Sequence, residues 1–519
     1  MSSYSIPLRI PLRSLAGPFF CALFLLIWCY GSSLFFFTMG TDEELRFASG
    51  WTQNTAWLAD GRWAIYLLKF VFGSFVINPF YTAILAALAL AAAAAVTHHS
   101  LLAAAGRLGE ATGWSGLVLP ALLTTSPVFA FVLTFSTFDS EIGAAILLAV
   151  AAAVCSFNTL FGPRRHLAQL GATILLLLAF SVYQPMLIVW GLLTTALLLA
   201  YLVFHPDTER PPLAFRRLAY LAAAPLLALA ADKLVKTVVA LSVRPNGYVE
   251  QFFGWGRSSP PQVVSGLLTF WHGILSGTSF SAGFGWRLGL ALVAVALAYL
   301  VVRAVRSPQP ITALLLTGAL GILPFLLSFA LGGPIPLRTL FPFSFALALP
   351  PFLLYLGPPR APARGSLVGI ALFIAVLNAQ WINHAFASDY RRYTFDRFVG
   401  EQIGLRLSTL RADQGPAQLT VAVVGAIRAD AKVFGFKQET IGVSLFEWEG
   451  GNPYRITAFL QALGFTFVTG PTHAQIKQAI EASRALHPWP ATDSVKLTGD
   501  FVVVKLSDAT PEQIAKYGQ

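Results

Sequence analysis

Charged side chains are scarce in this sequence. Asp, Glu, Lys and Arg make up only 11% of its 519 residues, whereas 56% are hydrophobic. A soluble globular domain has about 25% charged residues. The scarcity excludes that class, and apolar runs that recur along roughly three quarters of the chain indicate a polytopic membrane protein.

Cysteine is scarce as well. The three cysteines, Cys21, Cys29 and Cys155, all lie within apolar runs, so the chain has neither a disulfide framework nor a CxxC metal motif. No His, Cys or carboxylate spacing resembles a zinc site. The P-loop, the GxGxxG fingerprint and the Ser nucleophile elbow are also missing, so nothing in the sequence supports nucleotide hydrolysis.

The positive charge is unevenly distributed. The net charge is +11, but the tail from Asp389 onward holds 14 basic and 13 acidic residues, so most of the excess lies in the apolar part. This distribution argues against a nucleic-acid patch and is typical of the charge that orients a protein in a membrane.

Eleven apolar runs predict about eleven transmembrane helices. The predicted spans are Leu15–Phe37, Pro79–Val96, Trp114–Phe135, Ile142–Phe157, Leu167–Val182, Pro185–Phe204, Leu218–Leu241, Trp286–Val302, Ile311–Leu331, Phe341–Leu356 and Leu367–Ile382. The first run is too long for a signal peptide, so we interpret it as a retained signal anchor.

Basic residues gather in alternate connections between these runs. They are Arg9, Arg13, Arg107, Arg164, Arg165, Arg210, Arg216, Arg217, Arg303, Arg306, Arg360 and Arg364. By the positive-inside rule, these connections face the cytoplasm. An odd number of spans then places the N-terminus inside and everything after Ile382 outside.

The spans define the domain organisation. Residues 1–385 form a transmembrane domain with two long outer loops, 38–78 and 242–285, and residues 386–519 form a small extracytoplasmic α/β domain. In the second loop, the apolar segment 263–275 is too short to cross a bilayer and predicts an interfacial helix or lid. The alternative is a twelfth, tilted span, and the alternation of basic loops argues against it.

The tail carries alternating helix and strand patterns. Residues 389–413 predict an amphipathic helix that leaves the membrane. Strand patterns at 419–425, 465–470 and 494–506 then alternate with helix patterns at 454–464 and 473–486, and a Gly-Asp turn divides the last strand pattern. This alternation predicts a small α/β domain of ordinary size.

The first outer loop concentrates charge. It contains Asp42, Glu43, Glu44, Arg46, Asp60, Arg62 and Lys69 beside Trp51, Trp57 and Trp63. Carboxylates near lipid carry a desolvation penalty, so such groups usually face water, a cavity or a partner. We interpret the loop as an active-site loop, with the tryptophan rings as anchors in the headgroup layer. The alternative is an ordinary solvated loop.

Four further positions on the outer side could contribute to a site, and each has a structural alternative. Asp139 in FSTFDSEIG could cap the following helix, and Gln184 in SVYQPM could mark a helix break before Pro185. Lys236 could simply pair with Asp232, four residues earlier on the same helix. Arg338 in GGPIPLRTLFPF could bind a phosphate or reach toward lipid headgroups.

The chemistry of these groups is complementary. A carboxylate in a groove of low dielectric can act as a general base toward a hydroxyl, and Arg and Lys can hold a phosphate. This combination suits the transfer of a group that is carried on a lipid phosphate. Glu44 and Lys236 are further candidates for substrate contact.

Short motifs then suggest a family. An acidic pair in the first outer loop, followed by GRW at residues 61–63 and then by FDSEIG, YQP, PLRTL and an outer α/β domain, resembles the integral-membrane glycosyltransferases of the GT-C superfamily. More narrowly, the chain is similar to the Gtr-type glucosyltransferases that decorate bacterial O-antigen in lipopolysaccharide.

The resemblance implies that a sugar, with glucose as the first candidate, is transferred with inversion from a polyprenyl-phosphate donor to a cell-envelope glycan. The transfer would take place at the periplasmic face of the bacterial inner membrane. Asp42 would be the acid that deprotonates the acceptor hydroxyl, and Glu43 the second acid of the pair. Arg46, Arg62 and Arg338 would contact the donor phosphate, with Asp139 and Gln184 at the border of the site. This chain has Asp-Glu-Glu where the family has two adjacent aspartates, which leaves open which acid is the base.

No cofactor or metal is required, because basic side chains could stabilise a lipid monophosphate as leaving group. Three adjacent acids nevertheless keep a divalent ion possible.

Two other functions compete with the transferase. A flippase for polyprenyl-linked sugars should carry its ionisable groups near the bilayer midplane, whereas most of them lie here at one rim. An O-antigen polymerase or ligase fits the compact acidic loop less well.

Overall fold

The computed structural model describes residues 6, 11–49, 55–110, 114–161, 164–205, 213, 215–357, 361–414, 418–428 and 430–518. The chain forms two compact units. Unit 1 comprises Met1–Leu34, Asn54–Leu133 and Phe138–Ile382, and unit 2 comprises Phe35–Gln53, Thr134–Thr137 and Asn383–Gln519. Arg9, Trp51, Arg210 and Arg360, which the sequence singled out, lie outside the described residues.

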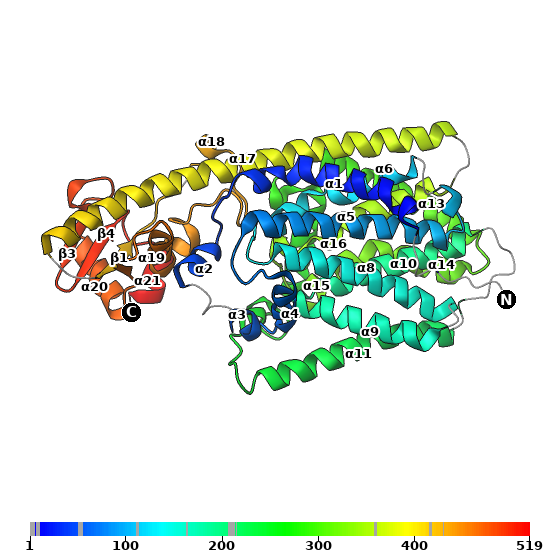
Figure 1. Cartoon of the computed structure of the whole chain (residues 1–519), viewed down its shortest axis with the longest axis horizontal. Helices are drawn as coiled ribbons and strands as arrows, with labels where there is room; N and C mark the ends of the chain where they lie inside the picture. Colours follow the sequence, from blue (N-terminus) through cyan, green and yellow to red (C-terminus); the bar gives the residue numbers. More distant parts are fainter. Residues whose placement is uncertain are drawn as a thin grey trace. The chain divides into compact units, whose positions relative to one another are not determined.

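Unit 1 is a bundle of apolar helices that run side by side (Figure 1). Its long helices are α1 (Leu12–Phe35), α5 (Pro79–Ala104), α8 (Asp139–Phe161), α9 (Arg165–Val182), α10 (Met186–Phe204), α11 (Phe215–Val239), α13 (Phe284–Val305) and the first part of α17 (Ala361–Gln414). The shorter ones are α3 (Thr55–Ala59), α4 (Trp63–Phe72), α6 (Ser115–Thr124), α7 (Ala130–Leu133), α12 (Pro260–Ser276), α14 (Pro310–Ile322), α15 (Leu326–Leu331) and α16 (Pro342–Tyr355).

These helices confirm a polytopic α-helical membrane protein. Each of the eleven predicted spans has a helical counterpart, but in the described part of the chain nine helices, or ten with one bent pair, are long and apolar enough to cross a membrane. The bent pair is α6 with the segment Pro127–Leu133, at 46°. The bend follows from Pro127, because a residue before proline avoids helical geometry and Ser126 is extended here (ψ 126°). The tenth predicted span, α16, has only 14 residues.

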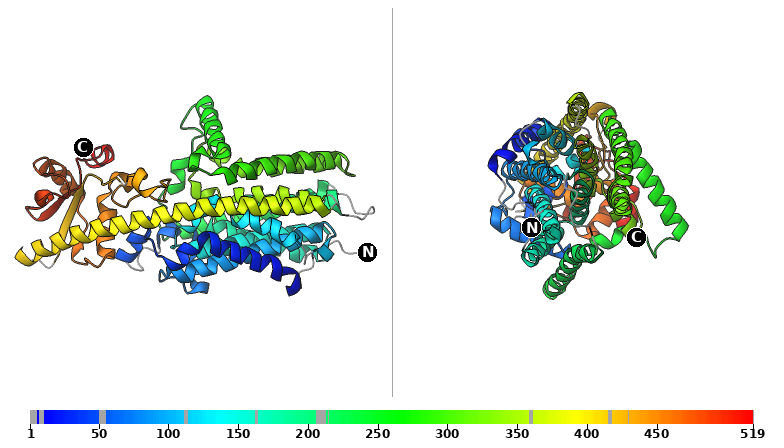
Figure 2. Two further views of the ribbon diagram at one scale, coloured as in Figure 1. Left: turned by 90° about the horizontal axis from the view of Figure 1, so that it is seen from above. Right: turned by 90° about the vertical axis from the view of Figure 1, so that its right-hand side faces the viewer.

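The segment predicted to be an interfacial helix or lid forms α12. It begins with a capping box in which Ser259 and Gln262 satisfy each other's backbone N–H groups, and it ends at Gly277 in the left-handed conformation (φ 78°). It is not among the candidate spans found in the described residues. Figure 2 (left) shows this green helix lying across the direction of the long helices rather than along it. Val264, Leu268 and Leu275 on α12 are exposed.

The centre of unit 1 is packed through small residues. The helices α8 and α10 are the most buried of the candidate spans. A Cβ atom on Gly143 of α8 would lie 2.9 Å from the Cα of Ala86 on α5, so glycine is required for the two backbones to approach this closely. Close approach through small residues is typical of membrane helices, where lipid offers no hydrophobic advantage to larger side chains.

Unit 2 contains a four-stranded mixed sheet with the strand order β2-β1-β4-β3 (Figure 1). The strands are β1 (Leu419–Val424), β2 (Val468–Thr469), β3 (Val495–Thr498) and β4 (Phe501–Lys505). The central strand β1 pairs in parallel with β2 and β4, and β3 pairs antiparallel with β4 across the predicted turn. The helices of unit 2 are α2 (Glu43–Ser49), α18 (Ala431–Phe434), α19 (Pro453–Ala462), α20 (His473–Ser483), α21 (Pro511–Tyr517) and the rest of α17.

The sheet is covered on both faces, as the apolar β1 and β4 sequences require. Side chains alternate between faces along a strand. Val421 and Val502 face a core that includes Ile403 of α17 and Phe459 of α19, whereas Val424 and Val503 face one with Ala479 of α20. The predicted small α/β region is confirmed. The amphipathic pattern from Asp389 continues the preceding span as one helix, α17, of 54 residues.

Candidate active site

The acidic segment packs into unit 2. The ring of Phe36 lies 5.3 Å from that of Tyr390, and the ring of Phe37 lies 6.1 Å from that of Tyr393. Met39 is part of the core beneath the sheet. The sequence placed all of the loop 38–78 in the transmembrane domain. The structure divides this loop, because these apolar anchors join residues 35–53 to unit 2.

Asp42 is the most accessible of the three acids. Its side chain is 45% exposed, and its Oδ1 lies 3.0 Å from a guanidinium nitrogen of Arg455. Its backbone has φ 81°, in the left-handed region that few residues other than glycine adopt. Aspartate tolerates this conformation better than most side chains. Strained backbone of this kind is often found at functional sites, which makes Asp42 a functional candidate.

Glu43 lies in the protein interior. Its Oε2 accepts a hydrogen bond of 2.6 Å from the backbone N–H of Gly40. Its Oε1 accepts one of 2.8 Å from the backbone N–H of Ser136 and another from the Ser136 hydroxyl. Burial raises the pKa of Glu43 to about 7, although these hydrogen bonds favour the charged form. Glu43 therefore connects the acidic segment to residues 134–137, and both of its carboxylate oxygens are occupied.

Glu44 faces the C-terminal part of the chain. It is fully buried, and its Oε1 accepts a hydrogen bond from the guanidinium of Arg455. Its Oε2 has no hydrogen-bond partner among the described residues. Burial raises the pKa of Glu44 to about 7 against the opposing effect of Arg455. Arg46 lies in the last turn of the same helix.

The three adjacent acids do not converge on one point. Asp42 faces Arg455, Glu43 faces Ser136, and Glu44 faces Arg455 from the interior. Within the described part of the chain, no group of three or more His, Cys, Asp or Glu side chains is arranged to hold a metal ion.

The buried Glu43 should make stability depend on pH. Its pKa is about 7 in the folded protein against an ordinary 4.5, so between these values the unfolded chain loses a proton that the folded protein keeps. Stability should therefore fall as pH rises from about 4.5 to about 7 and then level off. We expect Glu43→Gln to lower stability at pH 5 and to flatten this slope, as measured by the thermal unfolding midpoint at several pH values. A slope equal to that of the wild type would contradict the assignment.

Two arginines predicted to bind a phosphate line one cavity in unit 1. The cavity has a volume of about 110 Å³, and its lining residues include Arg62, Gln184 and Arg338 among apolar side chains such as Phe252 and Leu331. Three predicted site residues that are far apart in sequence are therefore brought together. An apolar cavity with a few convergent polar groups is the usual form of a small-molecule site.

Arg62 is held by aromatic rings. It precedes α4, is 8% exposed, and its guanidinium carbon lies 5.5 Å from the centre of the Trp57 ring and 4.9 Å from that of Tyr183. Its Nε is buried without a hydrogen-bond partner among the described residues. The prediction that Trp57 anchors the loop in the headgroup layer is wrong, because this ring is 6% exposed and packs against Phe138.

A second, larger cavity adjoins the first. Its volume is about 360 Å³, it shares Gln184 and Tyr248 with the first, and its lining includes Lys236 and Asp60. Tyr248 accepts a hydrogen bond from Arg338 through its hydroxyl oxygen. Four of the predicted residues, Arg62, Gln184, Lys236 and Arg338, thus line two cavities that share Gln184 and Tyr248.

Asp232 and Lys236 form the ion pair that the sequence offered as an alternative. The Lys236 Nζ lies 2.5 Å from Oδ2 of Asp232. The other oxygen of Asp232 accepts hydrogen bonds of 2.6 Å from Ser181 and 3.0 Å from the Trp63 indole. Both oxygens of this buried carboxylate therefore have partners. Lys236 also lines the larger cavity.

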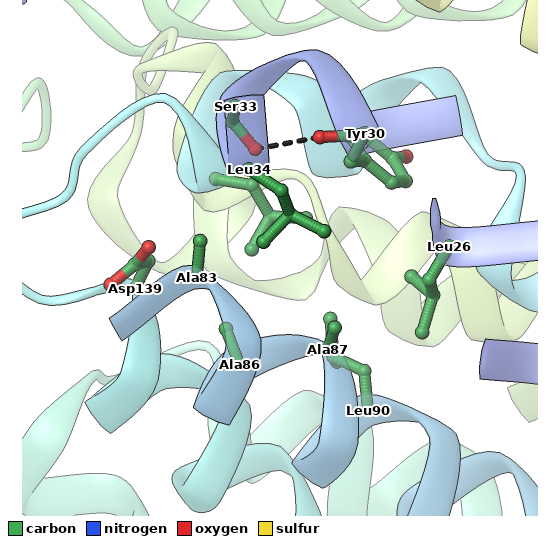
Figure 3. A pocket seen from close by; sticks show the side chains of 10 residues that line it. Leu26, Tyr30, Ser33, Leu34, Ala83, Ala86, Ala87, Leu90 and Asp139 are labelled. Atoms are coloured by element: carbon green, nitrogen blue, oxygen red, sulfur yellow. Dashed lines mark hydrogen bonds between the residues drawn. The ribbon is translucent and has the colours of Figure 1, made fainter. Parts of the chain in front are cut away.

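Asp139 lies apart from these two cavities. It begins α8, its Oδ1 accepts a hydrogen bond of 2.7 Å from the backbone N–H of Ser140, and it is 2% exposed. It lines a third, apolar cavity with Leu34, Ala83 and other residues of α1 and α5 (Figure 3). The neighbouring Glu141 accepts hydrogen bonds from Lys69 (3.3 Å) and Ser74 (2.6 Å).

The family model described as Glucosyl transferase GtrII matches residues 31–355, which is well over half of the chain. The chain belongs to this family. No curated protein and no solved structure matches it.

The GtrII family match confirms the predicted resemblance and supports a glycosyltransferase rather than a carrier. The matched region of this GtrII-family chain runs from within α1 to the end of α16. It therefore contains Asp42, Glu43, Arg62, Lys236 and Arg338. The long helix α17 and the sheet of unit 2 lie beyond it.

Sequence reasoning missed three contacts of the GtrII-family chain. Arg455 was part of a predicted helix in the tail, Tyr248 was one of several polar residues in a loop, and Ser136 lies in the stretch FSTFDSEIG, just before the FDSEIG motif. No local signal marks Arg455, because it is 413 residues from Asp42. The only available hint for Ser136 was its place three residues before Asp139, at a break between helices.

Proposed function

We propose that the protein transfers a sugar, with glucose as the first candidate, from a polyprenyl-phosphate donor to a cell-envelope glycan such as O-antigen at the periplasmic face of the bacterial inner membrane. The observation that carries the proposal is the cavity of unit 1, where Arg62 and Arg338 project among apolar side chains. Such a cavity suits a ligand that combines a phosphate with a lipid. The GtrII family match supports the transfer of a sugar, and the family description, a glucosyl transferase, makes glucose the first candidate.

The donor phosphate is bound by Arg62 and Arg338, with Lys236 in the adjoining cavity as a further cation. Arginine presents a planar fork that matches a phosphate and is more weakly hydrated than lysine, so it suits a buried site. The rings of Trp57 and Tyr183 hold the Arg62 guanidinium in place. Gln184, which lines both cavities, offers an amide for a sugar hydroxyl.

Asp42 is the general base of the proposed reaction. It is the one acid of the three with an exposed carboxylate. The acceptor oxygen attacks the anomeric carbon and loses its proton to Asp42, while the bond from that carbon to the phosphate oxygen breaks. The electron pair leaves with the lipid phosphate, whose charge the arginines stabilise. One in-line displacement inverts the anomeric carbon. Glu43 supports the segment from the interior.

Transfer by the purified protein tests this function. We would reconstitute the full chain in liposomes and measure the movement of labelled sugar from a panel of polyprenyl-phosphate sugars to cell-envelope glycan. We expect transfer from at least one polyprenyl-phosphate donor, with free polyprenyl phosphate as the second product. Transfer only from nucleotide sugars, or labelled lipid that crosses the bilayer without transfer, would contradict the proposal.

A further inference from the structure

Arg455 joins the acidic segment to the part of the chain that lies outside the family match. It lies in the first turn of α19, and its side chain is 14% exposed. Its guanidinium contacts Asp42 at 3.0 Å, Glu44, and Glu449 at 3.4 Å. Burial disfavours the charged form, but the three carboxylates outweigh this effect and raise the pKa of Arg455 above its usual range.

We propose that Arg455 is a positioning residue for the transfer reaction, which fixes the carboxylate of Asp42 in the orientation that receives the acceptor proton. The inference rests on the proposed function of Asp42. It gives the C-terminal part of the chain a direct role in the reaction, in addition to any role in recognition of the acceptor.

The geometry explains why an arginine is needed. The three nitrogens of one planar group contact three separate carboxylates, which a lysine ammonium on a flexible stem cannot reproduce. Asp42 has a strained backbone, φ 81°, and needs such an external contact to stay in place. Glu44 is fully buried, and removal of its cationic partner would leave an uncompensated charge in the interior.

The charged groups around the segment set the expected pH dependence. Glu43 and Glu44 come from α2, Glu449 from the turn before α19, and Tyr393 on α17 faces Glu43. Arg455 is a positive charge that faces Asp42 and Glu44. When it is lost, these acids remain without this compensating charge, so the pH profile of transfer should move upward.

The test compares full-length variants in transfer assays across a range of pH. We expect Arg455→Met to lower kcat at pH 7 by about 10- to 100-fold with little change in the donor KM, and to move the acidic limb of the pH profile upward. Arg455→Lys should recover part of the rate. Arg484→Met, which removes an exposed arginine of the same unit paired with Glu481, is the matched control and should behave like the wild type.

Hydrogen exchange provides a readout that does not depend on activity. In Arg455→Met, the amides of residues 41–49 should lose protection while β1 and β4 keep theirs. If Arg455→Met does not fold, the double variant Glu44→Gln with Arg455→Met removes the buried charge and takes its place in both experiments. Unchanged protection of 41–49, or a reduced rate with an unmoved pH limb and no recovery in Arg455→Lys, would overturn the positioning role.

Discussion

Asp42→Asn should lower the rate of sugar transfer by about 10³-fold at pH 7, because a general base contributes roughly 10²- to 10⁴-fold to a reaction. Asparagine keeps the size of the side chain and also tolerates the left-handed backbone, so the fold should survive. The donor KM should change little, since the donor phosphate is assigned to the arginines of unit 1. The measurement is single-turnover transfer from a saturating polyprenyl-phosphate donor.

Glu449→Gln is the matched control for this substitution. Glu449 is 47% exposed, nearly the same as Asp42, and it also pairs with Arg455. It differs in having no assigned chemical role, so Glu449→Gln should transfer sugar within a few fold of the wild type. Equal losses in both variants would show that the segment needs the charges around Arg455 and not a base at Asp42. Full activity of Asp42→Asn would remove Asp42 as the base.

Local sequence patterns predicted most of the helices and strands. A transmembrane span can be recognised from the length of its own apolar run, which is why each of the eleven runs has a helical counterpart. The bend at Pro127 and the short α16 were missed, because hydropathy reports composition and not backbone direction. The strands of the tail could also be recognised from local sequence patterns. Their order in the sheet could not be predicted in this way, since β1 and β4 pair across about 80 residues.

The candidate site was only partly accessible to sequence reasoning. Charge in an apolar chain is costly, so Arg62, Arg338 and Lys236 are conspicuous and could be selected one by one from the sequence. The sequence did not show that they line neighbouring cavities. The different environments of Asp42, Glu43 and Glu44 depend on Arg455 and Ser136, which approach from distant segments. Sequence therefore identified the acids but could not rank them.

Substitution of the two cavity arginines should have the second large effect. Arg62→Met and Arg338→Met each remove a cation that, in the proposed reaction, contacts the donor phosphate in the ground state and stabilises its greater charge when the sugar leaves. A hydrogen bond to a charged group contributes about 1.5 to 3 kcal/mol, so each variant should lose about 10- to 100-fold in kcat/KM. Arg338→Lys should recover only part of this loss, because lysine lacks the planar fork.

Competition by free polyprenyl phosphate separates phosphate binding from a general loss of fold. Wild-type transfer should be inhibited by this lipid product, and Arg338→Met should need at least tenfold more of it, about 1.4 kcal/mol of lost affinity. Arg287→Met, at an exposed arginine of the same unit that donates to the backbone of Ser276, should be inhibited like the wild type. If Arg338→Met transfers poorly but binds polyprenyl phosphate normally, the arginine acts on something other than the donor phosphate, and the cavity must hold a different part of the substrate.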